Sequence, residues 1–320
     1  MTEPIIRVTD IAWGRIRSPD LDVQEEFLTN FGMVRAERTN NALYMRGTDP
    51  SHHIHVTELG DPGFISLAFN AASEEDLHKL AAEAESATEV QDIDEPGGGK
   101  RVTITEPNGY GIEVVWGIED HAPIEVDRHP YNLSNIDKYA RSGDLWRKPQ
   151  GPSHPKRIGH GVIGTPKLRE SINWMRHHIG LVGTDEVYVE GDEEKVVASF
   201  NRIDAGKKFV DHHVFLFVHN EKAGLNHLSY EVPDFDDVVM GHEYLRDTGK
   251  YKHVWGLGRH VLGSQIYDYW MDPWDRVHEH WCDTDVLNQD YGTKLVAAEE
   301  GFGSQWGEPA PMEFIGHVSP

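Results

Sequence analysis

Three side chains with metal-binding chemistry lie far apart in the chain, each inside a short run typical of a β-strand. His160 lies in RIGHGVI, His227 in LNHLSYEV and Glu279 in RVHEHW. Two neutral imidazoles and one carboxylate on one face of an octahedron leave the opposite face open, which suits a non-haem Fe(II) that must bind two further ligands. Mn(II) accepts the same donors, whereas Zn(II) prefers a tetrahedral site with fewer open positions. These three residues are therefore our candidate metal ligands.

No local motif supports these candidates, because 67 residues (227 − 160) and 52 residues (279 − 227) separate them. Taken singly, a strand histidine beside a glycine is more often a hydrogen-bonded core residue than a ligand, and a strand glutamate could simply face solvent. Strand alternation does point Glu279 away from its neighbours His278 and His280. The case for one joint site depends on an internal repeat.

The chain contains two similar halves. Each half has a strand-like run before an amphipathic helix, then a second such pair, and later an acid-proline turn before another strand. The matched segments are 8–21 with 157–168, 63–84 with 224–245, and 105–117 with 271–283. Aligning them puts Trp13, Ser66 and Glu113 opposite the three candidate ligands. The first copy has lost both imidazoles, so a metal site confined to the second copy is the simplest account.

The order of elements in each half predicts an α+β fold. In the second half we expect strands at 157–164, 186–190, 195–203, 211–218, 225–232, 265–271 and 276–282, and helices at 168–179 and 235–248. Two curved, mostly antiparallel sheets follow, each able to hold a ligand in its concave face. We divide the chain into an N-terminal non-catalytic module (1–125), a linker (126–155), a C-terminal metal-binding module (156–290) and a C-terminal arm (291–320).

The second half resembles the catalytic module of the type I extradiol dioxygenases, in the vicinal oxygen chelate superfamily. The resemblance is carried most specifically by VDHHVFLFV, GLNHLSYEV and GRHVLGSQIYDYWMDPWDRVHEHW. It covers nearly the whole chain and implies two tandem modules, each a pair of βαβββ units that form a curved, half-open mixed sheet. The metal ligands of that family fall on His160, His227 and Glu279. The resemblance implies Fe(II) as the metal, with Mn(II) as the alternative.

Three further residues carry over from the resemblance. The family's acid–base histidine precedes the second ligand by fourteen or fifteen residues and matches His213 (227 − 14). A tyrosine ten residues before the glutamate ligand matches Tyr269, and in some members a histidine nine residues before that tyrosine matches His260. Without the resemblance, His213 would be a surface histidine in an edge strand, as we expect His212 to be, and Tyr269 an ordinary core aromatic.

The activity that the resemblance implies is extradiol ring cleavage. A catechol-type substrate chelates the metal, O2 binds at the remaining position, and both oxygen atoms enter a 2-hydroxymuconic semialdehyde-type product. Tyr269 would hydrogen-bond the substrate oxygen, His213 would act as general acid, and His260 would help to hold the substrate. Members of this family are commonly homo-oligomers, which we also expect here. The candidates for aromatic packing against the ring are Trp255, Trp270 and Trp281.

Two other interpretations stay open. An isomerase or epimerase of the same superfamily typically draws ligands from both modules, which Trp13 and Ser66 disfavour. A non-catalytic small-molecule-binding protein of the same fold needs no metal triad, and a metal assay would identify it. Two weaker motifs are set aside: EPGGGKR lacks the spacing of a phosphate-binding loop, and His52, His53 and His55 have no nearby carboxylate, so we expect them at the surface.

Composition excludes several classes of function. The 320 residues include 30 basic and 54 acidic ones, for a net charge of −24, which disfavours binding to nucleic acid or an anionic membrane. The one cysteine, Cys282, permits neither an intramolecular disulfide nor a thiolate metal cluster and fits a reducing cytoplasm. The segment MTEPIIRVTD has no signal-peptide pattern, and no apolar run approaches the ~20 residues that cross a bilayer. We expect a soluble cytoplasmic enzyme that acts on a small molecule.

Overall fold

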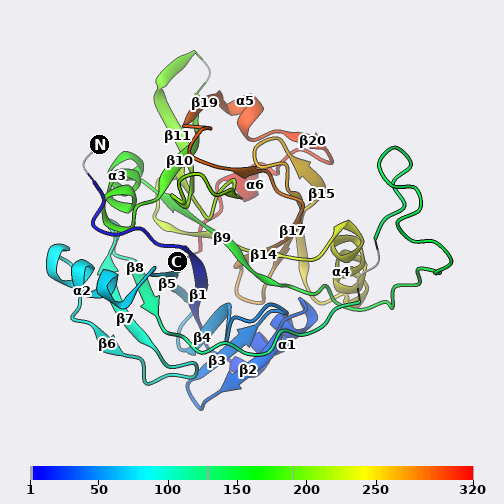
Figure 1. Ribbon diagram of the computed structural model, residues 1–320, viewed down its shortest axis with the longest axis horizontal. Helices are drawn as coiled ribbons and strands as arrows, with labels where there is room; N and C mark the ends of the chain where they lie inside the picture. Colours follow the sequence, from blue (N-terminus) through cyan, green and yellow to red (C-terminus); the bar gives the residue numbers. More distant parts are fainter. Residues whose placement is uncertain (1–2, 128–129, 190, 320) are drawn as a thin grey trace.

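The computed structural model describes residues 3–127, 130–189 and 191–319, and its first large sheet is built by the N-terminal half of the chain (Figure 1). The elements of this half are β1 (Asp10–Ser18), α1 (Leu21–Asn30), β2 (Val34–Arg38), β3 (Ala42–Arg46), β4 (His55–Leu59), β5 (Gly63–Asn70), α2 (Glu74–Glu83), β6 (Gln91–Asp92), β7 (Lys100–Thr105) and β8 (Gly111–Trp116). The strand order is β2-β3-β4-β1-β5-β8-β7-β6. Two βαβββ units therefore lie side by side, joined where β1 and β5 pair antiparallel.

The second large sheet repeats this plan. Its elements are β9 (Arg157–Thr165), α3 (Leu168–Ile179), β10 (Val182–Val189), β11 (Asp192–Arg202), β12 (Val210–Asp211), β13 (Phe215–His219), β14 (Gly224–Glu231), α4 (Phe235–Thr248), β15 (Lys252–His260), β16 (Ile266–Met271), β17 (Val277–Cys282), β18 (Val286–Leu287), β19 (Lys294–Ala297), α5 (Ala298–Gly301), β20 (Ser304–Trp306) and α6 (Met312–Ile315). The strand order is β19-β10-β11-β13-β9-β14-β17-β16-β15-β20, and β12 pairs separately with β18.

Both sheets are mixed, with a majority of antiparallel pairs, as the element order and the resemblance predicted. Two parallel pairs flank the centre of each sheet: β1 with β4 and β5 with β8 in the first, β9 with β13 and β14 with β17 in the second. The second sheet has a further parallel pair, β10 with β19, at one edge. The α+β class and both expected helices of the second half are confirmed, and so are the expected strands except 211–218, which is divided between β12 and β13. Residue 190, at the end of the expected strand 186–190, lies outside the described residues. Within the described residues, no helix is both long and apolar enough to cross a membrane.

The helices begin and end where local side chains satisfy the backbone. Asp20 accepts hydrogen bonds from two backbone amides in the first turn of α1, and Ser73 forms a capping box with Asp76 at the start of α2. Helices α3 and α4 end at Gly180 and Gly249, which adopt φ values of 74° and 63° that other residues rarely adopt. The buried faces of all four helices contribute to one core that also contains residues of both sheets.

Two glycines let the sheets approach each other closely. A Cβ on Gly14 of β1 would lie 2.6 Å from a methyl carbon of Leu228 in β14, and a Cβ on Gly161 of β9 would lie 2.7 Å from a methyl carbon of Leu67 in β5. Both leucines are fully buried. The contacts are reciprocal, because each module inserts a leucine into the gap that the other module's glycine leaves. Any larger residue at either glycine would have to displace the facing leucine or push the sheets apart.

The pairing register confirms the alignment of the two copies. In the second sheet, Ser229 is the common neighbour of His160 and Glu279. In the first sheet, Ala68 takes the same place between Trp13 and Glu113. Each equivalent residue therefore projects from an equivalent strand position, although the chemistry of the side chains differs.

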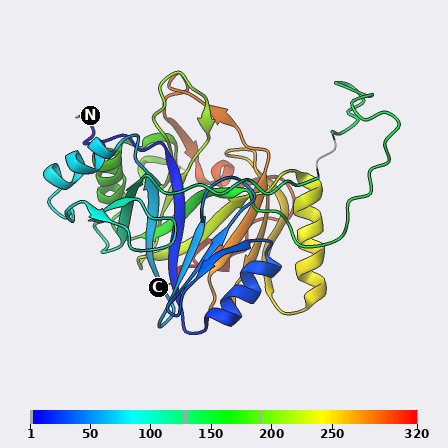
Figure 2. The same ribbon diagram turned by 60° about the horizontal axis from the view of Figure 1, so that its bottom comes forward.

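Two segments differ from the expectation. Strand β15 was not among the expected strands, because KHVWGLGRH holds two glycines and does not alternate apolar and polar residues. The tail after residue 290, expected as an extended arm, contributes β19 and β20 to opposite edges of the second sheet. The segment that joins the two sheets includes a long loop that runs out from the body of the molecule near α4 (Figures 1 and 2).

Candidate metal centre

The structure brings together the three candidate ligands, which come from the central strands of the second sheet. His160 lies on β9, His227 on β14 and Glu279 on β17. The Nε2 atoms of the two histidines lie 3.0 Å and 3.5 Å from the Oε2 atom of Glu279, and 3.4 Å from each other. Three potential ligand atoms thus surround one point. Two of their atoms, Glu279 Oε1 and His160 Nδ1, are buried and have no hydrogen-bond partner.

Charge and burial favour the protonation states that a divalent metal requires. Burial alone would raise the pKa of Glu279, but interactions with the nearby imidazoles of His160, His227 and His260 outweigh it and hold that pKa well below its usual value. Burial also lowers the pKa of His160. The site therefore presents a carboxylate and neutral imidazole, which are the metal-binding forms of these side chains. This donor set fits Fe(II) or Mn(II), with positions left for other ligands.

Two neighbours orient the candidate ligands, and sequence reasoning missed both. The Oδ1 atom of Asn226 accepts a hydrogen bond from His227 Nδ1 at 2.6 Å, so Nε2 is the ring nitrogen left to face Glu279 and a metal ion. The amide nitrogen of Asn226 in turn donates to the backbone oxygens of Phe314 and His317 in the C-terminal arm, which fixes the amide's orientation. Ser229 Oγ donates to Glu279 Oε2. Their adjacency to the ligands in sequence and in register was the available signal.

His213 lies at the edge of the centre, with its ring centroid 4.3 Å from that of His160. Its Nδ1 atom lies 3.1 Å from Nδ1 of His212, whose Nε2 lies 2.6 Å from Oδ2 of Asp185. If Asp185 accepts from His212 Nε2, then His212 Nδ1 accepts from His213 Nδ1, and His213 Nε2 is free to exchange a proton. Burial lowers the pKa of His213 well below its usual value. The expectation that His212 is a surface residue is wrong, because it is buried within this chain of contacts.

Tyr269 and His260 lie together on the other side of the centre. Tyr269 Oη lies 2.9 Å from His260 Nε2, which lies 3.6 Å from Glu279 Oε1. Burial raises the pKa of Tyr269 well above its usual value, so the phenol keeps its proton and can donate a hydrogen bond. Trp255 stacks beside Tyr269 with an angle of 9° between the ring planes. All three predicted catalytic side chains thus lie around the candidate ligands.

A cleft of about 670 Å³, counted to its open mouth, connects this centre with solvent. Its polar lining is gathered near the candidate ligands, and most of the remaining wall is apolar. The C-terminal arm closes one side of it with Phe302, Phe314 and Ile315. Of the three tryptophans considered as ring-packing residues, Trp255 lines the cleft, whereas Trp270 and Trp281 are core residues outside it.

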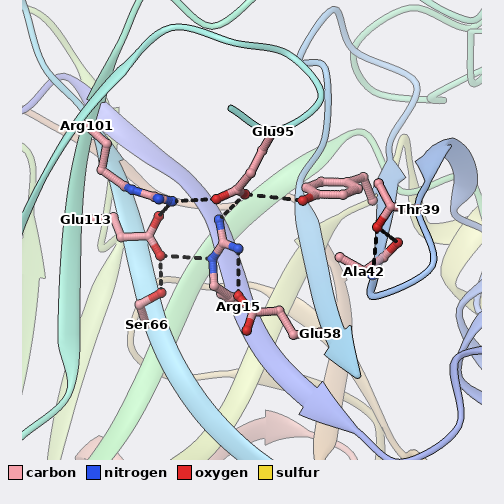
Figure 3. A network of polar contacts seen from close by, with 9 residues as sticks. Arg15, Thr39, Ala42, Glu58, Ser66, Glu95, Arg101 and Glu113 are labelled. Atoms are coloured by element: carbon pink, nitrogen blue, oxygen red, sulfur yellow. Dashed lines mark hydrogen bonds and ion pairs between the residues drawn. The ribbon is translucent and has the colours of Figure 1, made fainter. Parts of the chain in front are cut away.

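The equivalent place in the first module holds a network of ions instead (Figure 3). Arg15 Nε lies 3.0 Å from Oε1 of Glu113, and Arg101 lies 3.1 Å from Oε2 of the same carboxylate. Ser66 Oγ also donates to Glu113, and further carboxylates from Glu58 and Glu95 contact Arg15. No group of three His, Cys, Asp or Glu side chains in the described part of this module converges closely enough to bind a metal ion.

The first module nevertheless keeps the counterpart of His213. The register that aligns Gly14 with Gly161 also aligns His53 with His213. The ring centroids of Trp13 and His53 lie 4.5 Å apart, close to the separation of their counterparts. The expectation that His52, His53 and His55 are surface residues is wrong, because all three are buried. They are covered by the sheet and by neighbouring rings, which adjacency in sequence does not reveal.

Comparisons with known proteins agree with this arrangement. No protein family model matches the chain. Metapyrocatechase 2 of Cupriavidus necator is 29% identical over 304 residues, which cover 93% of this chain and 88% of that protein. The manganese-dependent 2,3-dihydroxybiphenyl 1,2-dioxygenase of Geobacillus genomosp. 3 is 23% identical over 285 residues, covering 85% of this chain and 83% of that protein.

Solved structures share the fold along the whole chain. An extradiol ring-cleaving dioxygenase from B. fuscum superposes with a TM-score of 0.80 at 17% identity, covering 100% of this chain and 84% of that one. The Mn(II)-bound glyoxalase from Novosphingobium aromaticivorans superposes with a TM-score of 0.78 at 21% identity, covering 98% and 95%. The resemblance inferred from the sequence is thereby confirmed: the chain is similar, over nearly its whole length, to extradiol dioxygenases of the vicinal oxygen chelate fold.

Proposed function

We propose that the protein is an extradiol dioxygenase that cleaves a catechol-type ring and inserts both atoms of O2, giving a 2-hydroxymuconic semialdehyde-type product. His160, His227 and Glu279 would hold Fe(II), with Mn(II) as the alternative. The observation that carries this proposal is the convergence of these three ligand atoms beside a cleft that the two histidines line together with His213 and Tyr269. One open side for two oxygen-bearing ligands is what ring cleavage requires.

The metal would supply a positive charge to which both catechol oxygens can bind, and it would lower the pKa of a bound hydroxyl. Tyr269 would donate a hydrogen bond to the substrate oxygen near the metal, because its phenol keeps its proton. His260 holds the Tyr269 hydroxyl at 2.9 Å and so fixes the direction of that hydrogen bond. Substrate binding would thus be oriented by residues of β15 and β16.

His213 would move the proton. Its Nε2 is the one ring nitrogen not directed at His212, so it can accept a proton from the substrate hydroxyl and return it to oxygen later in the reaction. The C-terminal arm would exclude water, because Phe314 and Ile315 cover one side of the cleft. The first module would have no direct part in the chemistry.

The lining of the cleft also points to the kind of ring. Among the described residues that form its wall, none is Lys, Arg, Asp or Glu. A ring bearing a carboxylate would therefore lose its hydration without gaining a cationic partner. We propose a substrate with no charged substituent, such as an unsubstituted, alkylated or fused-ring catechol.

The decisive experiment is anaerobic purification with metal analysis, followed by oxygen-uptake assays on a panel of catechols. We expect one catalytic metal per chain, a yellow ring-fission product, and faster turnover of uncharged than of carboxylated rings. Reconstitution of the metal-free protein with Fe(II) and with Mn(II), separately, decides which ion supports turnover. Absence of oxygen uptake with either ion across the panel would overturn the proposal, and isomerase activity without oxygen uptake would favour the alternative within the superfamily.

We further propose that the enzyme is a cytoplasmic homo-oligomer. Its single cysteine is buried and free, which fits a reducing compartment. In the loop between the sheets, Ile136 and Tyr139 are 78% and 74% exposed. Apolar side chains on a projecting loop commonly pack against another subunit. Light scattering should give a multiple of the 36.2 kDa chain mass for the wild type and a smaller assembly for an I136S/Y139S variant. A monomeric wild type would refute this proposal.

A further inference from the structure

A second group of metal-binding side chains lies in the C-terminal module, away from the candidate centre. It consists of His242 on α4, His253 on β15 and Asp268 on β16. Because strand neighbours point to opposite faces, Asp268 faces away from the cleft into which Tyr269 points. Nδ1 of His242 and Nε2 of His253 lie 3.0 Å and 2.8 Å from the same oxygen, Oδ1 of Asp268.

This geometry is like that of the candidate catalytic centre. There, too, two imidazole nitrogens approach one carboxylate oxygen, at 3.0 Å and 3.5 Å from Glu279 Oε2. In each group all three ligand atoms lie within 4.8 Å of one another. Ligands of a tetrahedral zinc ion lie roughly 3.3 Å apart, given metal–ligand distances of about 2.0–2.1 Å. A shift of a few tenths of an ångström would therefore admit an ion.

The surroundings favour a cation and leave it a path of entry. The carboxylate of Asp268 is fully buried, while the side chains of His242 and His253 are 18% and 32% exposed. Trp270 Nε1 donates to Oδ2 of Asp268, which holds the carboxylate with Oδ1 turned toward the histidines. The cation nearest to His242 along the helix, Arg246, is paired with Asp247 and Glu243. Its charge is therefore largely compensated.

We propose that His242, His253 and Asp268 form a second metal site, which binds Zn(II) or a similar divalent transition-metal ion. Two imidazole nitrogens and one carboxylate oxygen are ligands that zinc accepts, and a water molecule completes the tetrahedron on the exposed side. The bound ion ties α4 to β15 and β16, the two strands that carry His260 and Tyr269. It takes no part in the reaction, so the proposal is independent of the dioxygenase assignment.

The test counts zinc ions on the full chain after the first site has been disabled. In a Glu279→Gln variant, stripped with chelator and titrated calorimetrically with Zn(II), we expect one equivalent to bind. Adding His253→Ala should weaken that binding by at least about tenfold. Adding His219→Ala, which removes an exposed histidine at the end of β13, should leave it unchanged. X-ray absorption at the zinc edge of E279Q should show two histidine nitrogens.

Three results would overturn the proposal. E279Q protein that binds no zinc would show that Asp268 is satisfied by hydrogen bonds from the imidazoles alone. Equal zinc affinity in E279Q and E279Q/H253A would place the ion elsewhere. A zinc-edge spectrum without histidine ligands would do the same. Thermal melting gives a second measurement: zinc should raise the Tm of E279Q and leave that of E279Q/H253A unchanged. Because His253 is partly exposed, its replacement should not prevent folding.

Discussion

The two modules hold a buried glutamate at the same strand position in different ways. In the second module, Glu279 faces two imidazoles, and these imidazoles line the cleft. In the first, the guanidinium groups of Arg15 and Arg101 contact both oxygens of Glu113 (Figure 3). In the first module, side chains of the protein itself compensate the charge of the glutamate. The second leaves a carboxylate oxygen without a partner, and an external cation can supply the missing charge.

The difference depends on a few residues of a shared framework. Arg15 lies two residues after Trp13 on β1, and its counterpart two residues after His160 on β9 is Val162. A long cationic side chain at this position reaches the carboxylate, whereas valine lines the cleft and leaves the space open. One fold thus supports either an ionic core or a candidate metal centre, and the difference lies in side chains and not in topology.

The largest expected effect comes from Glu279→Gln, which removes the anionic ligand. We expect the iron or manganese content of the first site to fall to a trace and oxygen uptake to drop by at least about a thousandfold, because the ion would lose its charge partner. Metal analysis and an oxygen electrode measure both effects. Retention of a full equivalent of iron would refute the assignment of the ligands, and would also erase the contrast with the first module.

Next in size is the effect of His213→Phe, which removes the proton-transfer group without touching a ligand. Turnover should fall by about 10²- to 10⁴-fold while metal content stays unchanged. The matched control is His53→Phe at the equivalent position of the first module, which should leave turnover per bound metal unaltered. Equal losses in the two variants would mean that His213 acts through packing.

Glu113→Gln should affect stability and not chemistry. It leaves Arg15 with one partner fewer in a buried place. Breaking an isolated buried pair costs about 3–5 kcal/mol. Because Glu58 and Glu95 also contact Arg15, we expect a smaller loss of about 2–3 kcal/mol in the free energy of unfolding. Denaturant titration measures the loss, and metal content is the control. Loss of metal in this variant would show that the two sites are not independent.

The smallest expected effect is that of Asp185→Asn, which weakens the contact with His212 that positions His213. We expect kcat to fall by about tenfold with little change in KM, and the pH profile of kcat to shift. The comparison here is between His212, which contacts Asp185 at 2.6 Å, and its counterpart His52, which stacks on His121. An unchanged kcat and pH profile would limit Asp185 to a structural role.

The fold and the convergence of the candidate centre were predictable because they recur. The internal repeat identified three widely separated residues, His160, His227 and Glu279. In the structure their ligand atoms lie within 4.8 Å of one another. The alternation of apolar and polar residues predicted the strands of the second half, but it did not predict β15, because two glycines interrupt the pattern there.

Side-chain contacts between residues that neither the repeat nor a motif relates could not be predicted from the sequence. Asp185 lies 27 residues from His212, and only the pairing of β10 within the sheet brings the two together. His52 and His53 were expected at the surface because no nearby carboxylate completes a metal site, and His212 because it was assigned to an edge strand. Both histidines of each pair are instead covered, which depends on tertiary packing. The role of Arg15 could not be predicted from the repeat, because its counterpart in the second copy, Val162, carries no charge.

Through the reciprocal glycine and leucine contacts, the N-terminal module helps to position the strand that carries a candidate metal ligand in the C-terminal module. Leu67, from a module without ligands, fills the gap beside Gly161, and the next residue along β9 is His160. Duplicated genes usually free one copy to drift or to be deleted. Here each half supplies a leucine that packs against a central-strand glycine of the other, so loss of either half would expose that strand. The two copies differ in the chemistry of their side chains, yet each depends on the other for the packing of its central strand.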